Sequence, residues 1–248
     1  MYQERAYRRG MGFSRFSSVT VAVGESDLWI GYAPFSVAPD ALVKESTRVL
    51  RRLRNEILNY PDSLFLSSLV PLRKREDGVS PFLEGMIRAA RLSGTGPMAS
   101  VAGAIAQEVG SVLKRKFSLD EIVVENGGDL YIDTLKPLSV TLFAGSNKLS
   151  GKVSIIVDME HCPLGVCTSS AKVGHSHSFG RADAVMVACK DAALADAYAT
   201  AFCNMVREEA DVERVSRLMN EKEEILSALV LLDTKLALCG QLEVRNKA

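Results

Sequence analysis

The feature that most constrains the fold is a run of small residues in the middle of the chain. Residues 97–104 read PMASVAGA, and the helical pattern that they open continues to residue 116. Pro97 suits a first helical turn, because its missing N–H is one that a helix start leaves unpaired. Small residues let one backbone approach another closely. We therefore predict a helix that packs tightly against a sheet or, equally, against a second subunit.

The period of the apolar residues changes along the chain and predicts the fold class. Helical spacing is found at 39–60, 62–69, 81–92, 98–116, 191–207 and 211–220. Strand patterns are found at 121–125, 129–133, 138–143, 153–158, 165–168 and 182–188. Hairpins are predicted over 12–33 and 225–244, and an additional edge strand at 4–9. Helices grouped early and strands grouped late indicate an α+β protein rather than a doubly wound sheet.

Length and composition limit the class of protein. A chain of 248 residues lies near the upper limit for one hydrophobic core, so we expect residues 1–248 to form one domain or two closely packed lobes. The formal net charge is +0, which gives no global attraction to nucleic acid or to an anionic membrane. No stretch reaches the roughly 18 apolar residues of a membrane span. Nucleic-acid and membrane partners are therefore not expected.

The cysteines and the N-terminus indicate the compartment. The 5 cysteines contain no C-x-x-C pair, which favours reduced thiols over a disulfide framework or a metal site. The first residues, MYQER, lack the apolar core of a signal peptide. We therefore expect a cytoplasmic protein.

A glycine-rich loop precedes the small-residue helix and is the first candidate binding element. Gly94 and Gly96 lie just before the predicted helix start, where free N–H groups and the helix dipole favour phosphate. The stretch matches neither G-x-x-x-x-G-K-[ST] nor G-x-G-x-x-G. Tight packing of this helix on a sheet explains the same residues equally well.

The second candidate element is Asn126-Gly127-Gly128-Asp129. Paired glycines permit positive φ and leave backbone N–H groups uncovered, so a ligand can meet the backbone between the two polar side chains. A tight hairpin turn is the competing interpretation, because Asn-Gly is the strongest short hairpin signal.

The third element joins hydroxyl groups to histidines. Thr168, Ser169 and Ser170 follow an apolar strand, and His175 and His177 would share one face of an extended segment. An H-x-H pair without a nearby third ligand is a weak metal signal. Structural hydrogen bonds or contacts with a ligand are the alternatives.

A fourth element pairs an acid with a hydroxyl. Asp196 and Thr200 are four residues apart on a predicted helix and so lie on one face. Carboxylate and hydroxyl oxygens suit Mg²⁺, which completes its shell with water and ligand phosphate. An acid near a helix N-terminus beside an internal threonine is the simpler explanation.

Together and in this order, over roughly residues 94 to 205, these elements resemble the ApbE family, and more closely a shorter branch of ApbE-like proteins. The most specific parts are NGGD at 126–129, CTSS at 167–170 and ADAYAT at 195–200. The family transfers FMN from FAD, with Mg²⁺, to a threonine of a partner protein. The resemblance implies mixed or antiparallel sheets packed with helices and a ligand cleft between the two halves.

The resemblance also implies roles for individual residues. Asp196, Thr200 and the carbonyl group of Ala102 would hold the metal. Residues 126–129 would line the flavin pocket, and residues 168–170 would face the nucleotide. His175 stands where the family has the histidine of its His-Ile-Ile-Asp-Pro segment and is the candidate catalytic residue, as an acid, a base or a phosphate contact.

Two departures from the family bear on catalysis. The Asp-Pro after His175 is absent, and the family's Ile-Ala-Lys-Gly reads VAGA at 101–104, without the lysine. A cation and a carboxylate that would lie near the phosphates are thus missing, and phosphoryl-transfer chemistry depends on such charges. Three hypotheses remain: a Mg²⁺-dependent enzyme that transfers FMN or cleaves the FAD pyrophosphate, a non-catalytic nucleotide-binding protein, and an enzyme acting on an unrelated phosphorylated metabolite.

Overall fold

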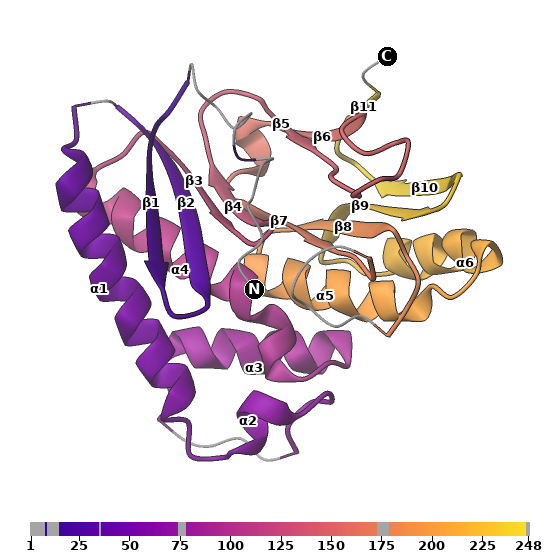
Figure 1. The fold of residues 1–248 in the computed structure, drawn as a ribbon, viewed down its shortest axis with the longest axis horizontal. Coiled ribbons are helices and arrows are strands. Elements are labelled where there is room, and N and C mark those ends of the chain that lie inside the picture. The colour runs from indigo at the N-terminus through magenta and orange to yellow at the C-terminus, as the bar shows by residue number, and fades with distance from the viewer. Residues whose placement is uncertain (1–7, 9–14, 35, 74–77, 173–178, 247–248) are drawn as a thin grey trace.

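The structure, a computed structural model, describes residues 8, 15–34, 36–73, 78–172 and 179–246. Its elements form three layers: a small sheet, a large sheet and a layer of helices (Figure 1). Every strand pair in the two sheets is antiparallel. The predicted α+β class is confirmed.

The large sheet has 8 strands in the order β1-β2-β3-β4-β7-β8-β9-β10. These strands are β1 Ser17–Val23, β2 Ser26–Ala33, β3 Glu121–Asn126, β4 Asp129–Asp133, β7 Leu164–Ser169, β8 Ala184–Cys189, β9 Ile225–Leu232 and β10 Lys235–Gly240. The small sheet has 3 strands, β5 Leu138–Thr141, β6 Val153–Val157 and β11 Val244–Asn246, with β6 in the centre.

Helices cover the face of the large sheet that is opposite the small sheet (Figure 1). They are α1 Pro39–Leu58, α2 Leu64–Ser67, α3 Pro81–Ser93, α4 Val101–Phe117, α5 Ala192–Met205 and α6 Glu209–Asn220, with short 3-10 turns at Pro97–Ser100 and Met159–His161. Of these, α1, α4, α5 and α6 contact strands, whereas α3 packs on α4 and α5 from outside.

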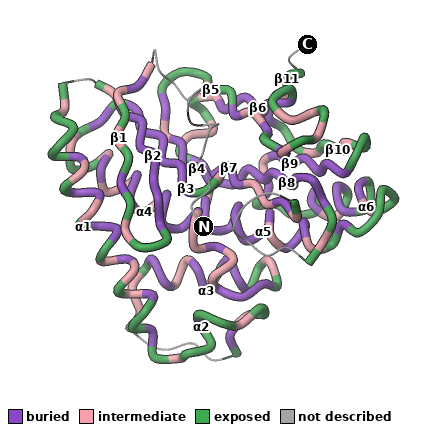
Figure 2. Tube along the Cα trace, in the orientation of Figure 1, coloured by how far each residue is buried: buried purple, intermediate pink, exposed green. Residues whose placement is uncertain are grey.

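Two apolar cores follow from this arrangement. The larger core lies between the sheet and the helices and includes Ile30, Val124 and Phe202. The smaller core lies between the two sheets and includes Trp29 and Ile155. Side chains on successive strand positions point to opposite faces, so both faces of the central strands are buried (Figure 2).

The first predicted hairpin is confirmed. Val19 pairs with Ile30 and Val21 pairs with Leu28, across a turn at Gly24 and Glu25. Two predictions about strands need correction or extension. Arg8, the one described residue of the expected edge strand 4–9, does not lie in a strand. The three-residue strand β11 was not predicted, because so short a segment cannot show an alternation of apolar and polar residues.

The small-residue helix packs on both of its neighbours within the chain. A Cβ on Gly103 of α4 would lie 2.2 Å from the carbonyl oxygen of Ala192, the first residue of α5. A Cβ on Gly110 would lie 2.4 Å from the ring of Tyr131 on β4. Gly165 of β7 is equally close to α5, since its Cβ would lie 2.3 Å from Ala192 Cα. The glycines therefore allow close contact of α4 with α5 and with the sheet, and of β7 with α5.

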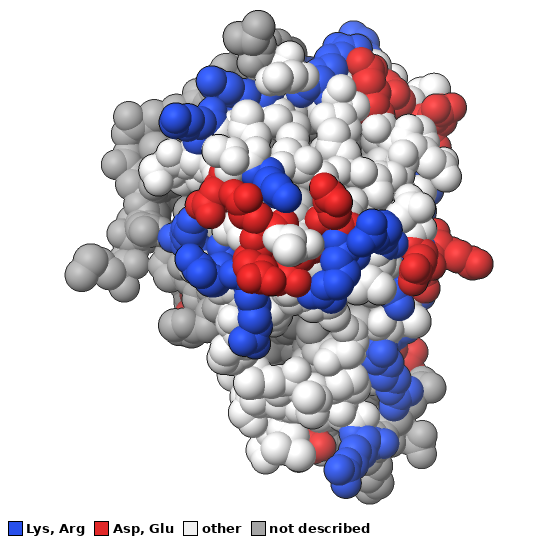
Figure 3. Space-filling model, turned by 90° about the vertical axis from the view of Figure 1, so that its right-hand side faces the viewer, with Lys and Arg blue, Asp and Glu red and all other residues white. Residues whose placement is uncertain are grey.

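The surface and the helices agree with the balanced composition. On the face drawn in Figure 3, acidic and basic side chains are interleaved rather than separated into a basic surface. Among the described residues, no helix has the length and apolar content that a membrane crossing requires.

Candidate functional site

The site is built on α5, which is buried on nearly all sides. Its apolar residues contact the sheet and the neighbouring helices, and its polar side chains Asp196, Thr200 and Asn204 recur every four residues. Residues at this spacing form one stripe along a helix. Asp196 is buried, whereas the other two are half-buried. The stripe thus presents polar groups along one side of a helix that is otherwise core.

The N-terminal end of α4 contacts Asp196, the first residue of this stripe. Asp196 Oδ2 accepts a hydrogen bond from the backbone N–H of Gly103 at 2.9 Å. The carbonyl oxygen of Ala102, one peptide away, accepts from Asn126 Nδ2 at 3.2 Å. Two hydrogen bonds and the Ala102–Gly103 peptide therefore connect Asp196 to Asn126. Three predicted site residues from different parts of the chain, Asp196, Ala102 and Asn126, thus lie close together.

The Gly127-Gly128 pair forms the turn between β3 and β4. Both glycines have positive φ, 72° and 108°, and Asn126 pairs with Asp129 across the turn. The hairpin interpretation is confirmed. Gly127 is exposed and Gly128 is half-buried, so the backbone of the turn remains accessible beside the two buried polar residues. Glu125 Oε1 accepts a hydrogen bond from the N–H of Gly128 at 2.7 Å and holds the turn from below.

The end of β7 completes the cluster. Asp129 Oδ1 accepts from the backbone N–H of Thr168 at 3.2 Å, and Ser169 Oγ lies 3.1 Å from Thr200 Oγ1. The Cys167 thiol contacts the Asp129 carboxyl group and donates to the carbonyl oxygen of Ala192 at 3.4 Å. The structure therefore brings the NGGD, TSS and ADAYAT elements and the start of α4 into one cluster.

Two carboxyl groups in this cluster influence each other. Burial raises the pKa of Asp129 well above its ordinary value, and the charge of Asp196 raises it further. Burial raises the pKa of Asp196 to about 7, although the N–H groups of Gly103 and Ala102 oppose the rise. Burial disfavours a charged carboxylate, and a second carboxylate nearby disfavours it further. Protonation of the pair is therefore favoured, and a bound cation would oppose it by favouring the ionised carboxylates.

The donor atoms fit Mg²⁺ rather than a softer metal. Two carboxyl groups, the carbonyl of Ala102 and the hydroxyls of Thr200 and Ser169 all offer oxygen, and Mg²⁺ uses one or two protein carboxylates plus water and ligand phosphate. Within the described part of the chain, no group of three or more His, Cys, Asp or Glu side chains is arranged to hold a metal. A cation here would therefore depend on the carbonyl and hydroxyl oxygens as well.

Other predicted residues have separate structural settings. Gly96 is buried, and a Cβ there would lie 1.7 Å from the carbonyl oxygen of Ser68, so chain packing already requires glycine at this position. Ser170 is buried, and its Oγ accepts from the N–H of Lys172 at 3.0 Å. His175 and His177 lie outside the described residues.

Sequence reasoning missed three participants. Asn204, whose Oδ1 accepts from the N–H of Phe179 at 2.7 Å, extends the stripe of Asp196 and Thr200, and its i+4 spacing was a readable signal. Glu125 directly precedes the NGGD motif and Cys167 is the first residue of CTSS, but no role was predicted for either. Nothing local in the sequence indicates that one holds the turn and that the other contacts Asp129.

Comparisons with known proteins show the family and the fold. Residues 10–233 match the model of a family described as "AbpE bacteria". A UPF0280 protein of Methanocaldococcus jannaschii is 38% identical over 186 residues, which is 73% of this chain and 74% of that protein. A UPF0280 protein of Methanothrix thermoacetophila is 36% identical over 212 residues, 86% of each chain.

Two solved structures share the fold. The flavinyl transferase ApbE of Pseudomonas stutzeri, in its apo form, has a TM-score of 0.62 at 15% identity and covers 90% of this chain and 94% of its own. The ApbE protein of Thermotoga maritima has a TM-score of 0.57 at 14% identity, over 93% of this chain and 97% of its own. The chain therefore belongs to the ApbE-like family, as a relative of its UPF0280 proteins.

Proposed function

We propose that this protein binds a flavin nucleotide together with Mg²⁺ at the cluster beside α5, and that it transfers FMN from FAD or cleaves the FAD pyrophosphate. The observation that carries the proposal is the convergence of Asp196, the Ala102–Gly103 backbone and the Asn126–Asp129 turn. Fold alone does not determine activity, so the proposal rests on these groups and on the family resemblance.

Each group has a role in this proposal. Asp196, Thr200 and the Ala102 carbonyl hold Mg²⁺, which would neutralise charge on the phosphates. The Gly127–Gly128 backbone meets the flavin, while Thr168 and Ser169 donate hydrogen bonds to the nucleotide. Transfer, unlike cleavage by water, would also require an acceptor protein that presents a hydroxyl group. The 5 free cysteines fit a reducing compartment, and we place the protein in the cytoplasm.

A second candidate is nucleotide binding without turnover, and one observation favours it. Gly103 occupies the position of the family's lysine, and any Cβ there would lie 2.2 Å from the carbonyl oxygen of Ala192. The close approach of α4 to α5 therefore excludes a side chain at this position. If the protein is catalytic, another group must supply the missing positive charge.

One set of measurements decides between these functions. The purified protein is incubated with FAD and MgCl₂, AMP and FMN are followed by chromatography, and binding of FAD and FMN is measured by calorimetry. The incubation is repeated with threonine-containing peptides as acceptors. Release of AMP that requires Mg²⁺, with or without an acceptor, supports catalysis, whereas saturable binding without AMP under both conditions supports the second candidate. Absence of both from folded protein contradicts both proposals.

A further inference from the structure

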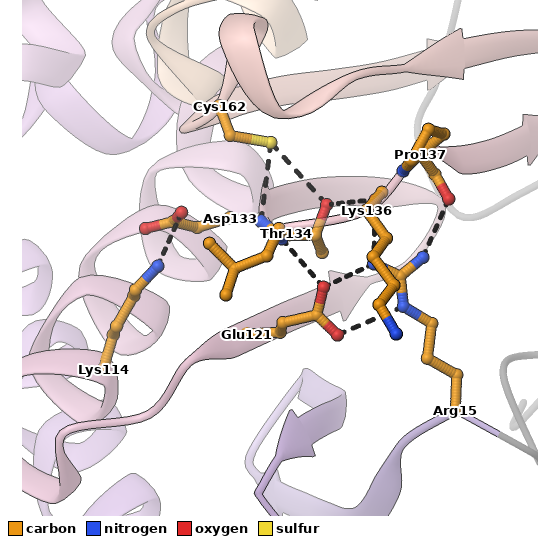
Figure 4. A network of polar contacts seen from close by, with 9 residues as sticks. Arg15, Lys114, Glu121, Asp133, Thr134, Lys136, Pro137 and Cys162 are labelled. Carbon is orange, nitrogen blue, oxygen red and sulfur yellow. Dashed lines mark hydrogen bonds and ion pairs between the residues drawn. The ribbon is translucent and has the colours of Figure 1, made fainter.

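Strand β3 carries one arginine–glutamate pair at each end. At the end away from the site, Arg15 Nη2 lies 2.5 Å from Glu121 Oε1, which also accepts from the N–H of Leu135 at 2.8 Å. Arg15 further donates to the carbonyl oxygens of Lys136 and Pro137, both at 2.8 Å (Figure 4). This pair fixes the loop between β4 and β5.

The pair at the site end joins Arg8 to Glu125. Arg8 Nε lies 2.5 Å from Glu125 Oε2, and its two other nitrogens donate to Asp27 of β2: Nη1 to Oδ1 at 3.0 Å and Nη2 to the carbonyl oxygen at 2.7 Å. The Glu125 side chain is 1% exposed and that of Arg8 is 12% exposed. The guanidinium group thus connects two adjacent strands from a partly buried position.

The second oxygen of Glu125 extends this connection to the candidate flavin site. Glu125 Oε1 accepts from the N–H of Gly128 at 2.7 Å. A turn of two glycines has no side chain of its own to restrict it, and glycine has more backbone freedom than any other residue. The Glu125 carboxylate is therefore a restraint on the turn between Asn126 and Asp129.

We propose that Arg8 is a positioning residue of the nucleotide site, acting through Glu125 on the Gly127-Gly128 turn. This inference rests on the proposed function. Arg8 fixes the direction of the Glu125 carboxylate, which in turn fixes the backbone that meets the ligand. All three guanidinium nitrogens donate to Glu125 or Asp27, so Arg8 acts through the protein rather than on a phosphate. Small displacements of a binding element have large effects on affinity and rate.

The matched pair at the other end of β3 supplies the control. Arg8→Ala is expected to weaken FAD binding roughly 10- to 100-fold, as displacement of a positioning contact does. Arg15→Ala removes a comparable ion pair from the same strand and is expected to leave the FAD affinity within about twofold, because its loop lies away from the site. Arg8→Lys keeps the charge but lacks the planar fork, so we expect intermediate affinity.

Amide hydrogen exchange tests the inference without any ligand. Arg8→Ala should accelerate exchange at the N–H of Gly128 and leave that of Leu135 unchanged, while Arg15→Ala should do the reverse. Unchanged exchange at Gly128 in Arg8→Ala, or equal loss of FAD affinity in both variants, would overturn the role of Arg8. Failure of the wild-type protein to bind FAD would instead remove the proposed function, and the Gly128 exchange would still decide whether Arg8 restrains the turn.

Discussion

Two kinds of buried acid differ in what stabilises their charge. Most of them contact an arginine or lysine side chain: Glu45 contacts Arg48 and Lys116, and Asp183 contacts Lys172. At the site, Asp196 accepts hydrogen bonds from backbone N–H groups, and its charge raises the pKa of Asp129.

The pKa values of the two groups are consequently shifted in opposite directions. Hydrogen bonds from Arg48 and Lys116 lower the pKa of Glu45 to about 2. Burial opposes ionisation of Asp183, but hydrogen bonds from Lys172, the Asp233 N–H and Asn147 outweigh it and lower the pKa. Burial instead raises the pKa of Asp196 to about 7. Perturbed carboxyl groups of this second kind cluster at functional sites, whereas ion-paired acids are common elsewhere.

The largest expected effect comes from removing the acid that would hold the cation. Asp196→Asn should weaken Mg²⁺-dependent FAD binding by at least about 100-fold. Mutation of a residue that only hydrogen-bonds to a metal ligand already lowers metal affinity about 10- to 100-fold, and Asp196 would be a ligand itself. Glu45→Gln removes a buried acid of the other group and should leave binding unchanged. Calorimetry with FAD and MgCl₂ measures both. Equal binding by the wild-type protein and Asp196→Asn would remove this residue from the proposed site.

The pH dependence of stability separates the two groups next. A carboxyl group with a raised folded-state pKa stabilises the fold fully below its unfolded value and loses that contribution as pH rises through the folded value. For Asp196 the window runs from about 3.8 to about 7. Glu45 behaves oppositely, and its contribution is lost as pH falls from 4.5 toward about 2.

We therefore expect the metal-free protein to lose stability from about pH 4 to 7, by an amount on the order of a few kcal/mol. Added MgCl₂ should reduce this loss, because the cation favours both ionised carboxylates. Thermal unfolding across this range measures the effect. If the stability rises steadily from pH 4 to 7 and does not change on addition of Mg²⁺, the raised pKa values of Asp129 and Asp196 and their role in cation binding are contradicted.

A neutral isostere at the second acid should sharpen the same comparison. Asp129→Asn keeps an oxygen for the Thr168 N–H but removes the charge that faces Asp196. We expect it to raise the stability of the metal-free protein at pH 8 by about 1–3 kcal/mol, as neutral replacements of unfavourable buried charges do. At pH 5, below the pKa of about 7 for Asp196, the change should be smaller. Denaturant unfolding of the wild-type protein and Asp129→Asn at both pH values provides the test. An equal stability change at pH 5 and pH 8 would contradict charge repulsion between Asp129 and Asp196.

The last prediction concerns the backbone that holds Asp196. Gly103→Ala forces a Cβ to within 2.2 Å of the Ala192 carbonyl oxygen, and we expect a loss of about 1–3 kcal/mol from overpacking. Gly85→Ala, in helix α3 with no atom within 4 Å of the added Cβ, should instead gain about 0.5–1 kcal/mol from helix propensity. Chemical denaturation compares the two. Similar values would show that α4 and α5 separate readily.

Much of the fold could be predicted from local patterns. The apolar patterns over residues 12–33 and 225–244 predicted the β1–β2 and β9–β10 hairpins. The pairing of β4 with β7 could not be predicted, because it joins residues across the β5–β6 insertion and depends on which sheet faces bury together. Period identifies strands but not distant partners.

The site was predictable in outline and not in its connections. Motif order placed Asp196, Thr200, Ala102 and the NGGD turn in one region, and the structure brings them together. The roles proposed for them remain predictions. The contact of Arg8 with Glu125 spans 117 positions in sequence, and the facing of Asp129 and Asp196 depends on three elements packing together. Neither leaves a trace in a short stretch of sequence.

The last strand, β11, pairs with β6 and thereby closes the small sheet over the second core. This cover is incomplete until residues 244–246 are in place, so the apolar core beneath it depends on a strand that lies far from β6 in the sequence. A truncation before residue 244 would remove β11 and leave every residue of the candidate site in place. It would expose apolar residues of the second core, on the opposite side of the large sheet, and we expect aggregation rather than weaker ligand binding.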